Sequence, residues 1–274
     1  MFADAALAAR IDRAEGRMCA QVADSIRRSK PGSAPFVLPI SGGEAVYVGP
    51  SSPLNKVIGL CLDCGLDVAA LERIEREWSE RGEPVRIEMS ILADPSLGSA
   101  LTDRGYGLHG FENVLGLPLD RTSAGPEIGG VTVEIVTDAT LRTWADIAVE
   151  AFLNLDGTGS VADAFEREQL TAVFDEMMVV PGFLRYVARI DGEAVGEAAM
   201  RIDGDLAQLA GAGTLPAARG RGVQKALLQR RLADAAAAGC TLSVVTTAPG
   251  TRSQDNAMRR SFELLYTRAI LIKR

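Results

Sequence analysis

The segment whose residue types best suit binding chemistry is the run Leu-Pro-Ala-Ala-Arg-Gly-Arg-Gly-Val-Gln, residues 215–224. Gly220 and Gly222 lack a Cβ atom, so the backbone can turn tightly and direct several N–H groups at one point. A helix that begins here adds free N–H groups and the positive end of its dipole, and Arg219 and Arg221 add full charges. The pattern predicts a phosphate or pyrophosphate site, and the alternative is a basic turn that only caps a helix.

Two nucleotide-binding motifs are excluded for this segment, because it contains neither GxxxxGK[ST] nor GxGxxG.

Charge is unevenly distributed in the chain. The net charge is −7, which disfavours a generally basic nucleic-acid binder. Residues 201–274 nevertheless hold twelve basic and five acidic residues. A basic quarter in an acidic protein indicates a local anionic ligand, or else only a solvated charged surface.

Other possible sites are weaker. The chain has a single histidine, His109, and four cysteines, which is no disulfide framework. Cys61 and Cys64 form a lone CxxC without a second pair, so we expect no metal and buried cysteines.

The first residues lack an apolar signal core, and no segment has the character of a membrane span. We expect a cytoplasmic protein without nucleic-acid or membrane partners.

Hydrophobic periodicity supplies the elements that position the loop. Apolar residues spaced by three and four predict helices, whereas short apolar runs between turn residues predict strands. The predicted helices are Leu7–Ile26, Val68–Arg81, Pro95–Arg104, Leu141–Phe152, Phe165–Val179, Val223–Ala238 and Ser253–Arg260. The predicted strands are Phe36–Ile40, Ala45–Val48, Lys56–Leu62, Val85–Ile91, Phe111–Leu117, Val131–Thr137, Phe183–Ile190, Ala194–Ile202, Leu206–Leu215, Leu242–Thr247 and Leu264–Ile272. A loop covers Asn154–Ser160.

The order of elements repeats. Leu71 and Leu227 are 156 residues apart, as are Arg104 and Arg260, and this offset places a similar series of elements in each half. Gly125, Pro126 and their neighbours have the composition of a linker at about 120–130. We therefore predict a mixed α/β (α+β) fold with two similar domains, residues 1–122 and 130–274.

The loop and its context resemble the GNAT-type N-acetyltransferases. The Pro-x-x-Arg-Gly-x-Gly-Val pattern is similar to their coenzyme A pyrophosphate loop, and the element order from Val131 onward matches their fold. The likeness is strongest to bacterial tandem GNAT proteins. It includes a tail with Ser253-Gln254, Asn256, Phe262 and Tyr266-Thr267-Arg268. Residues 1–122 match as a degenerate copy, so each GNAT-like domain should carry a largely antiparallel sheet flanked by helices.

The resemblance implies roles for particular residues. Backbone amides of the loop would hold the pyrophosphate, the preceding strand end would pair with the pantetheine arm, and a later short helix would contribute a side chain beside the coenzyme. These residues are Arg219, Gly220, Arg221, Gly222, Val223 and Gln224, then Ala212, Gly213, Thr214 and Leu215, and finally Asn256. The acetyl thioester would lie where the strands Leu206–Leu215 and Leu242–Thr247 part, and an N–H near Ala212–Thr214 would stabilise the oxyanion.

The chain departs from the family at the acid and base. The frequent general-acid tyrosine is absent, Ser261 replaces the usual glycine, and Ala217 replaces a frequent Gln or Arg. Tyr266 is a candidate acid, although a tyrosine on an apolar strand more often belongs to the core. Glu197 is a candidate base, although it alternates with Glu193 and Arg201 as a solvated strand face would. Deprotonation through water is the alternative.

The implied activity is transfer of an acetyl group from acetyl-CoA to the amine of a small, unidentified acceptor by direct attack. The alternative is a non-catalytic acyl-CoA-binding sensor or interaction module. Subtracting the repeat offset places Asp63–Asp67 where the second half has its basic loop. Two carboxylates there disfavour a pyrophosphate, so we expect one coenzyme A per chain and a first half that serves as an internal pseudo-dimer partner.

Overall fold

The computed structural model describes residues 3–119, 128–154 and 166–274. The predicted linker at 120–130 and the predicted loop Asn154–Ser160 lie mostly outside the described residues. The chain divides into two compact units. Unit 1 comprises Met1–Val114 together with Leu264–Arg274, and unit 2 comprises Leu115–Glu263.

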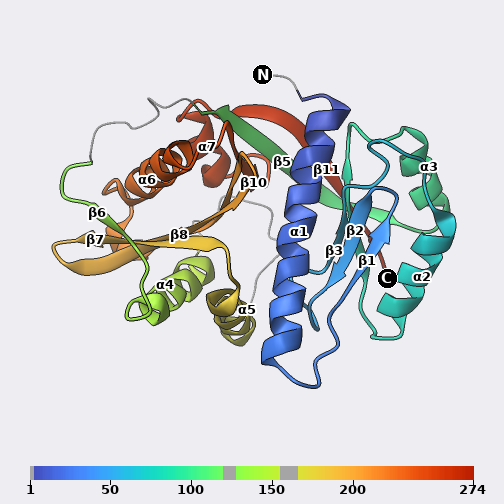
Figure 1. The fold of residues 1–274 in the computed structure, drawn as a ribbon, viewed down its shortest axis with the longest axis horizontal. Coiled ribbons are helices and arrows are strands. Elements are labelled where there is room, and N and C mark those ends of the chain that lie inside the picture. Colours follow the sequence, from blue (N-terminus) through green and yellow to red (C-terminus); the bar gives the residue numbers. More distant parts are fainter. Residues whose placement is uncertain (1–2, 120–127, 155–165) are drawn as a thin grey trace. The chain divides into compact units, whose positions relative to one another are not determined.

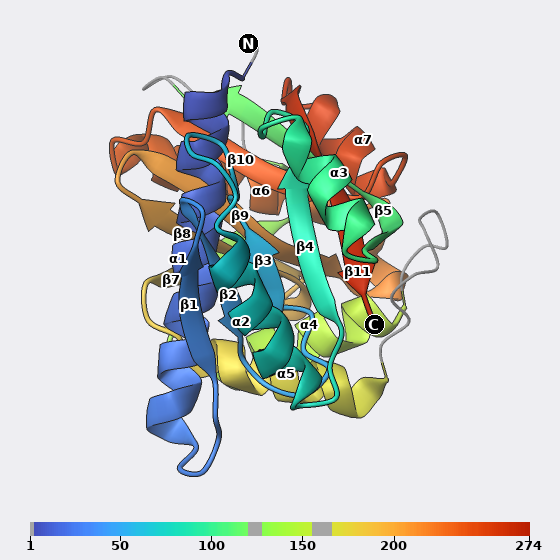
Figure 2. The same ribbon diagram turned by 90° about the vertical axis from the view of Figure 1, so that its right-hand side faces the viewer.

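Unit 1 contains a mixed sheet with helices on both faces (Figures 1 and 2). Helix α1 packs on one face, while α2 and α3 lie on the other. The strands lie in the order β1-β2-β3-β4-β11-β5. The pairs β1–β2, β2–β3 and β4–β11 are antiparallel, and the pair β3–β4 is parallel. The elements are α1 (Ala5–Ser29), β1 (Phe36–Ile40), β2 (Gly43–Tyr47), β3 (Lys56–Ile58), α2 (Val68–Ser79), β4 (Val85–Ser90), α3 (Ser96–Asp103), β5 (Gly107–Pro118) and β11 (Glu263–Lys273).

The strands of unit 2 lie in the order β10-β9-β8-β7-β6, with the end of β5 beside β10. Strands β6 to β9 are antiparallel to their neighbours, and β9 and β10 are parallel. Helix α6 covers one face, and α4 and α5 lie on the other (Figure 1). The elements are β6 (Thr132–Ile135), α4 (Leu141–Leu153), α5 (Arg167–Val179), β7 (Phe183–Ile190), β8 (Glu193–Asp203), β9 (Leu206–Thr214), the 3₁₀ turn η2 (Pro216–Ala218), α6 (Val223–Ala237), β10 (Leu242–Thr247) and α7 (Arg252–Met258).

The predicted elements and the repeat are confirmed. Helix α2 starts 155 residues before α6, β4 starts 157 before β10, and both α3 and β5 start 156 before their counterparts α7 and β11. The turn between β7 and β8 has positive φ at both Asp191 (52°) and Gly192 (85°), as a two-residue type I′ hairpin turn requires. The spacing of apolar residues was sufficient to locate these elements.

The last strand does not lie in the predicted domain. The sequence placed residues 264–274 in the second domain, whereas they belong to unit 1. There β11 pairs with β4 from Arg268↔Ser90 to Lys273↔Val85. Local periodicity identifies a strand but does not say which strand it pairs with, so the domain limits 1–122 and 130–274 follow the repeat and not the compact units.

A fully buried guanidinium holds β11 in unit 1. Arg268 forms ion pairs with Asp12 at 2.6 Å and Glu15 at 2.7 Å, both on α1. The hydroxyl of Tyr266 donates to the same Asp12 oxygen at 2.5 Å. Burial alone would lower the pKa of Arg268. The charges of Asp12 and Glu15 outweigh this effect and raise that pKa well above its ordinary value. The strand is thus fixed by charge as well as by its backbone ladder.

Further carboxylates complete this cluster. Carboxylate oxygens of Glu15, Glu88 and Glu112 lie within 4.8 Å of one another, a spacing that suits a metal ion. However, Lys56 bonds Glu15 and Glu88 at 2.9 Å each, and Arg268 reaches Glu112 at 3.2 Å. Protein cations therefore already neutralise the group, and we assign no metal to it.

We expect Arg268→Met to lower the free energy of unfolding by about 3–5 kcal/mol, because it leaves the carboxylate of Asp12 buried without its cation and removes one of the two cations that pair with Glu15. Urea unfolding at neutral pH measures the loss. Arg259→Met is the control, since Arg259 is exposed on α7 and should change stability by less than about 0.5 kcal/mol. Equal stability of the two variants would show that the ion cluster does not hold β11.

Candidate functional site

Strand β9 has an unpaired stretch in the middle of the unit 2 sheet. It pairs with β8 along its length, but with β10 only over Leu206–Gln208 against Leu242–Val244. Both strands continue, β9 to Thr214 and β10 to Thr247. Backbone N–H and C=O groups on this side of β9 are therefore open to an extended ligand, as they are at a sheet edge. The predicted parting of the two strands is present.

A β-bulge alters the backbone within this stretch. Ala198 pairs with Ala212 and Ala199 with Ala210, which leaves Gly211 without a partner on β8. Gly211 has φ +53°, a left-handed conformation that glycine adopts without strain. A bulge re-aims the peptide groups around it, so one N–H of β9 can point out of the ladder.

The basic loop follows β9 and leads into α6. Gly220 and Gly222 have φ +77° and +85°, so both glycines serve the turn as expected. Gly222 is the N-cap of α6, and no side chain caps this helix start. The first-turn N–H groups of α6 are consequently not covered by a capping side chain, which is what an anion cradle needs.

Side chains tie the loop to the end of β9. Gln224 donates to the hydroxyl of Thr214 at 2.9 Å, and Arg219 donates to the Thr214 carbonyl at 3.4 Å. Arg219 also bonds the carbonyl of Asn154. A Cβ on Gly196 would lie 2.4 Å from Val223 Cγ1, so this glycine lets α6 approach β8 closely. The loop and the open strand thus form one structural unit.

Glu197 lies directly across from this strand end. It pairs with Gly213 in the β8–β9 ladder, and it is fully buried. The interpretation of a solvated face is therefore wrong for Glu197. Glu193 is exposed, but a register shift at Val195 interrupts the alternation of β8 between the two residues. Glu197 is buried because α4 packs on its face: a Cβ on Gly213 would lie 2.5 Å from Ala151 Cβ and 2.9 Å from Glu197 Oε1.

The charge state of Glu197 is unusual. Neither carboxylate oxygen accepts a well-formed hydrogen bond among the described residues, although the nearby Gly213 N–H and Trp144 indole still act to lower its pKa. The indole itself donates to the Ala198 carbonyl at 3.2 Å. Burial raises the pKa of Glu197 to about 8, and the positive charge of Arg231 offsets only part of that increase. A carboxyl group poised near neutral pH in this way is suited to accept a proton.

The other predicted residues divide between the two units. Ala212, Gly213 and Thr214 form the end of β9, and Leu215 follows directly. Asn256 is half-buried on α7, which contacts β10. Tyr266 instead belongs to unit 1, where its hydroxyl bonds Asp12. Because this hydroxyl is engaged by Asp12 within unit 1, we give Tyr266 no part in the proposal for unit 2.

The sequence reasoning missed Arg231. This arginine is buried on α6, and it donates to the carbonyls of Ala199 and Gly211 at 3.1 and 3.4 Å. A signal was available, because Arg231 falls at an i+4 position between Leu227 and Ala235 on the buried stripe of its helix. A charge on an apolar stripe indicates a buried partner.

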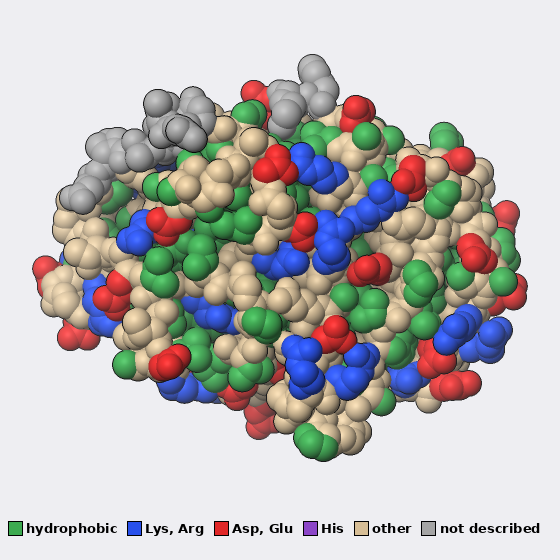
Figure 3. Space-filling view, viewed as in Figure 1, with side chains coloured by type: hydrophobic (Ala, Val, Ile, Leu, Met, Phe, Trp, Pro, Cys, Tyr) green, Lys and Arg blue, Asp and Glu red, His purple; other side chains and the backbone are tan. Residues whose placement is uncertain are grey.

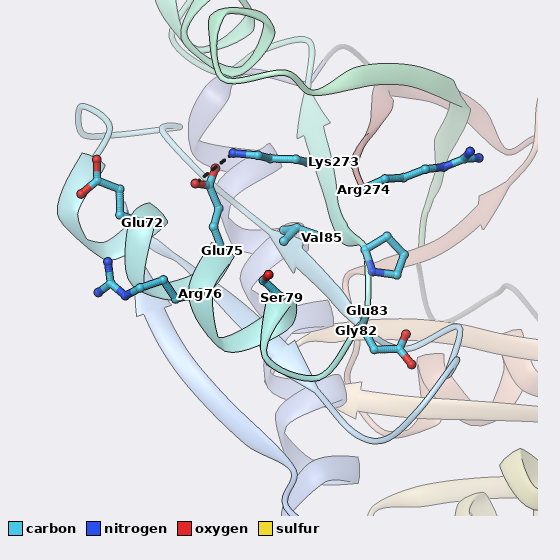
Figure 4. A pocket seen from close by; sticks show the side chains of 10 residues that line it. Glu72, Glu75, Arg76, Ser79, Gly82, Glu83, Val85, Lys273 and Arg274 are labelled. Carbon is cyan, nitrogen blue, oxygen red and sulfur yellow. Dashed lines mark ion pairs between the residues drawn. The ribbon is translucent and has the colours of Figure 1, made fainter.

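A separate pocket of about 710 Å³ lies in unit 1 beside α2 and the end of β11 (Figure 4). Lys273 points at Glu75 there and pairs with it at 3.2 Å, and Glu75 also binds Arg104 at 2.8 Å. Because Glu75 is already paired with two cations and none of the predicted residues lines the pocket, we do not place the site there.

Comparison with known proteins supports the family resemblance over part of the chain. The model of the acetyltransferase (GNAT) family matches residues 142–262, which is less than half of the chain. The GNAT-type resemblance expected from the loop is therefore confirmed. No curated protein matches the chain in sequence.

Solved structures confirm the fold over a longer range. A GCN5-related N-acetyltransferase from Kribbella flavida is 20% identical, with a TM-score of 0.65, and the match covers 94% of this chain and 95% of that one. A tandem GNAT protein from the clavulanic acid biosynthesis pathway is 13% identical, with a TM-score of 0.57, covering 83% and 73%. A GCN5-related N-acetyltransferase from Sphaerobacter thermophilus is 17% identical, with a TM-score of 0.58, covering 75% and 67%. The predicted tandem GNAT architecture is thus correct.

Three further observations concern the backbone at Ser261, the surface charge and the helices. Ser261, which occupies the usual glycine position, has φ +65°, so the backbone there keeps the conformation that favours glycine. On the visible surface, basic and acidic side chains are interspersed (Figure 3). Among the described residues, no helix combines the length and apolar character needed to cross a bilayer.

The pKa of Glu197 predicts a pH-dependent stability. Its value is about 8 in the folded protein against an ordinary 4.5, so folding requires proton uptake between these pH values and stability falls as pH rises from 4.5 to 8. Glu197→Gln carries no such penalty. Its advantage over the wild type should grow across this window by on the order of 4 kcal/mol and then level off.

Urea unfolding between pH 5 and 9 measures this difference in the free energy of unfolding. Glu193→Gln is the matched control, because Glu193 lies exposed at the start of the same strand. A constant difference between Glu197→Gln and the wild type across the range would contradict a raised pKa at Glu197.

Proposed function

We propose that unit 2 transfers an acetyl group from acetyl-CoA to the amine of a small acceptor. The observation that carries the proposal is the end of β9. Thr214 is bonded by the basic loop through Gln224 and Arg219, while the adjacent Gly213 faces the buried Glu197. The basic loop, the open side of β9 and the titratable carboxyl group of Glu197 thus come together at the two adjacent residues Gly213 and Thr214.

The loop would hold the pyrophosphate of the acyl donor. Its uncapped first turn, from Gly222 through Val223 and Gln224, supplies backbone N–H groups, and Arg219 and Arg221 supply charge. The unpaired stretch from Ala212 to Leu215 would bond the pantetheine arm as a further strand would. This places the acyl group beside the bulge, where a β9 N–H can stabilise the carbonyl oxygen as negative charge develops on it.

Glu197 would remove the proton of the attacking amine. A carboxyl group with a pKa of about 8 is a stronger base than an ordinary glutamate, although only a minor part of it is ionised at neutral pH. Because its side chain is fully buried, we propose that one water passes the proton from the amine to Glu197. The leaving thiol has an ordinary pKa of about 8.5, so it can depart as a thiolate without a dedicated acid.

Release of free thiol from acetyl-CoA over a panel of small amines tests the proposal. At least one amine should stimulate release well above the background without amine, and Glu197→Gln should lower that rate by about 10²–10³-fold. Binding of acetyl-CoA without stimulated release would favour a non-catalytic acyl-CoA sensor. Equal rates for Glu197→Gln and the wild type would exclude Glu197 as the base.

The loop should dominate affinity for the acyl donor. Gly222→Asp introduces a negative charge at the helix start and a Cβ at φ +85°, 2.9 Å from Ile128 Cγ2. We expect calorimetric acetyl-CoA binding to weaken by at least about tenfold. Gly239→Asp is the matched control, since Gly239 also has φ +85° and lies just after the other end of α6. Unchanged affinity in folded Gly222→Asp would reject the loop as the site.

Each chain should bind one coenzyme A, through unit 2. In unit 1 the residue equivalent to the loop end is Asp67, which caps α2 by accepting from the Ala70 N–H at 3.0 Å. Asp63 is paired with Arg13 at 2.5 Å. A carboxylate already occupies the helix start that would bind a phosphate, and like charge repels it. Titration with coenzyme A should give a stoichiometry near one per chain, and a value near two would overturn this assignment.

A further inference from the structure

Arg231 connects three elements of unit 2 through one side chain. Its Nε donates to the Leu227 carbonyl within α6 at 3.3 Å. Its Nη1 donates to the carbonyls of Ala199 on β8, at 3.1 Å, and Gly211 on β9, at 3.4 Å. The residue is buried. A buried guanidinium is costly unless its donors are used, so its bonds fix the surrounding backbone strongly.

The carbonyl groups that Arg231 binds are those of the bulge. Gly211 is the residue left without a partner, and Ala199 lies at the point where the β8–β9 register shifts. In a planar trans peptide the C=O and the following N–H point in opposite directions. Holding the Gly211 carbonyl toward α6 therefore turns the Ala212 N–H toward the opposite face of the sheet. That face is the one on which α4 packs and Glu197 is buried.

Arg231 also supplies the charge that Glu197 senses. The groups that act on Glu197 are Arg231 from α6, the Gly213 N–H from β9 and the Trp144 indole from α4. Those that act on Arg231 are Glu197 and, from β7, Tyr186. Burial lowers the pKa of Arg231 to about 10, so it remains charged at neutral pH.

We propose that Arg231 is a positioning residue of the transferase site, which aims the Ala212 N–H at the acyl carbonyl and holds a positive charge near the base Glu197. The proposal rests on the proposed function and adds to it a residue that touches neither substrate. One side chain then sets both the place where negative charge is stabilised and the pH at which Glu197 accepts a proton. Because Arg231 lies on α6, the same helix that begins at the basic loop also carries the side chain that positions the Ala212 N–H and acts on Glu197.

Two substitutions separate the roles. Arg231→Met removes the charge and the bonds, whereas Arg231→Lys keeps a charge but cannot reach carbonyls on two strands with the same fork. Carboxyl ¹³C NMR titration, with Glu197 assigned from Glu197→Gln, gives the pKa of Glu197 without substrate. Arg231→Met should raise that pKa by about one unit or more, and Arg231→Lys should leave it near the wild-type value.

Kinetics test the positioning. In Arg231→Lys, kcat should fall by about tenfold or more while KM for acetyl-CoA changes little, because the N–H acts on the developing charge and not on binding. Gly222→Asp should show the opposite pattern. Arg230→Lys is the control, since Arg230 is the neighbouring residue on α6 and bonds Asp234 and the Val133 carbonyl instead; it should match the wild type in both measurements.

An unchanged Glu197 pKa in Arg231→Met, or a wild-type kcat in Arg231→Lys, would overturn the proposal. If Arg231→Met does not fold, Arg231→Lys, which keeps the buried charge, decides the positioning role through kcat. If the wild type acetylates no amine, the proposed function fails, and the NMR titration still decides whether Arg231 controls Glu197.

Discussion

The site of unit 2 depends on one break in backbone pairing. Strand β9 leaves β10 after Gln208 but stays paired with β8 to Thr214, so the strand is held firmly on one side and open on the other. A fully paired β9 would offer no backbone group to a ligand, and a free one would have no fixed geometry. The bulge at Gly211 and the position of Glu197 opposite Gly213 both lie in the part of β9 that is paired on one side only.

Two buried arginines show how the surroundings decide what a charge does. Arg268 lies among several carboxylates and forms close ion pairs with them, which fixes a strand and leaves no open position for a substrate. Arg231 bonds backbone carbonyls and acts on the lone carboxyl of Glu197 from a distance. Paired charges stabilise the structure locally, whereas an unpaired buried carboxyl group keeps a pKa that chemistry can use.

Sequence patterns located nearly every element and the loop, because apolar spacing, glycine and charge are local signals. They did not reveal that Glu197 is buried, since alternation with Glu193 and Arg201 describes the strand and not the helix that covers it. They also assigned β11 to the wrong compact unit, because the partner of a strand depends on distant residues such as Asp12. Arg231 could be recognised as a charge on an apolar stripe. The carbonyl groups that it binds, however, belong to the bulge in β9, and no local pattern predicts that bulge.

The two halves of the repeat differ in what their equivalent helix starts offer to an anion. At equivalent helix starts, α6 has Gly222 with no side-chain cap, and α2 has Asp67, whose carboxylate bonds the Ala70 N–H. The capped start is more stable by roughly a few tenths of a kcal/mol, but its N–H groups are no longer free for a phosphate. The same position thus trades local stability against binding, and the uncapped glycine is the arrangement that a substrate anion would complete. In unit 1 the α2 start is instead satisfied by the side chain of its own N-cap residue, Asp67.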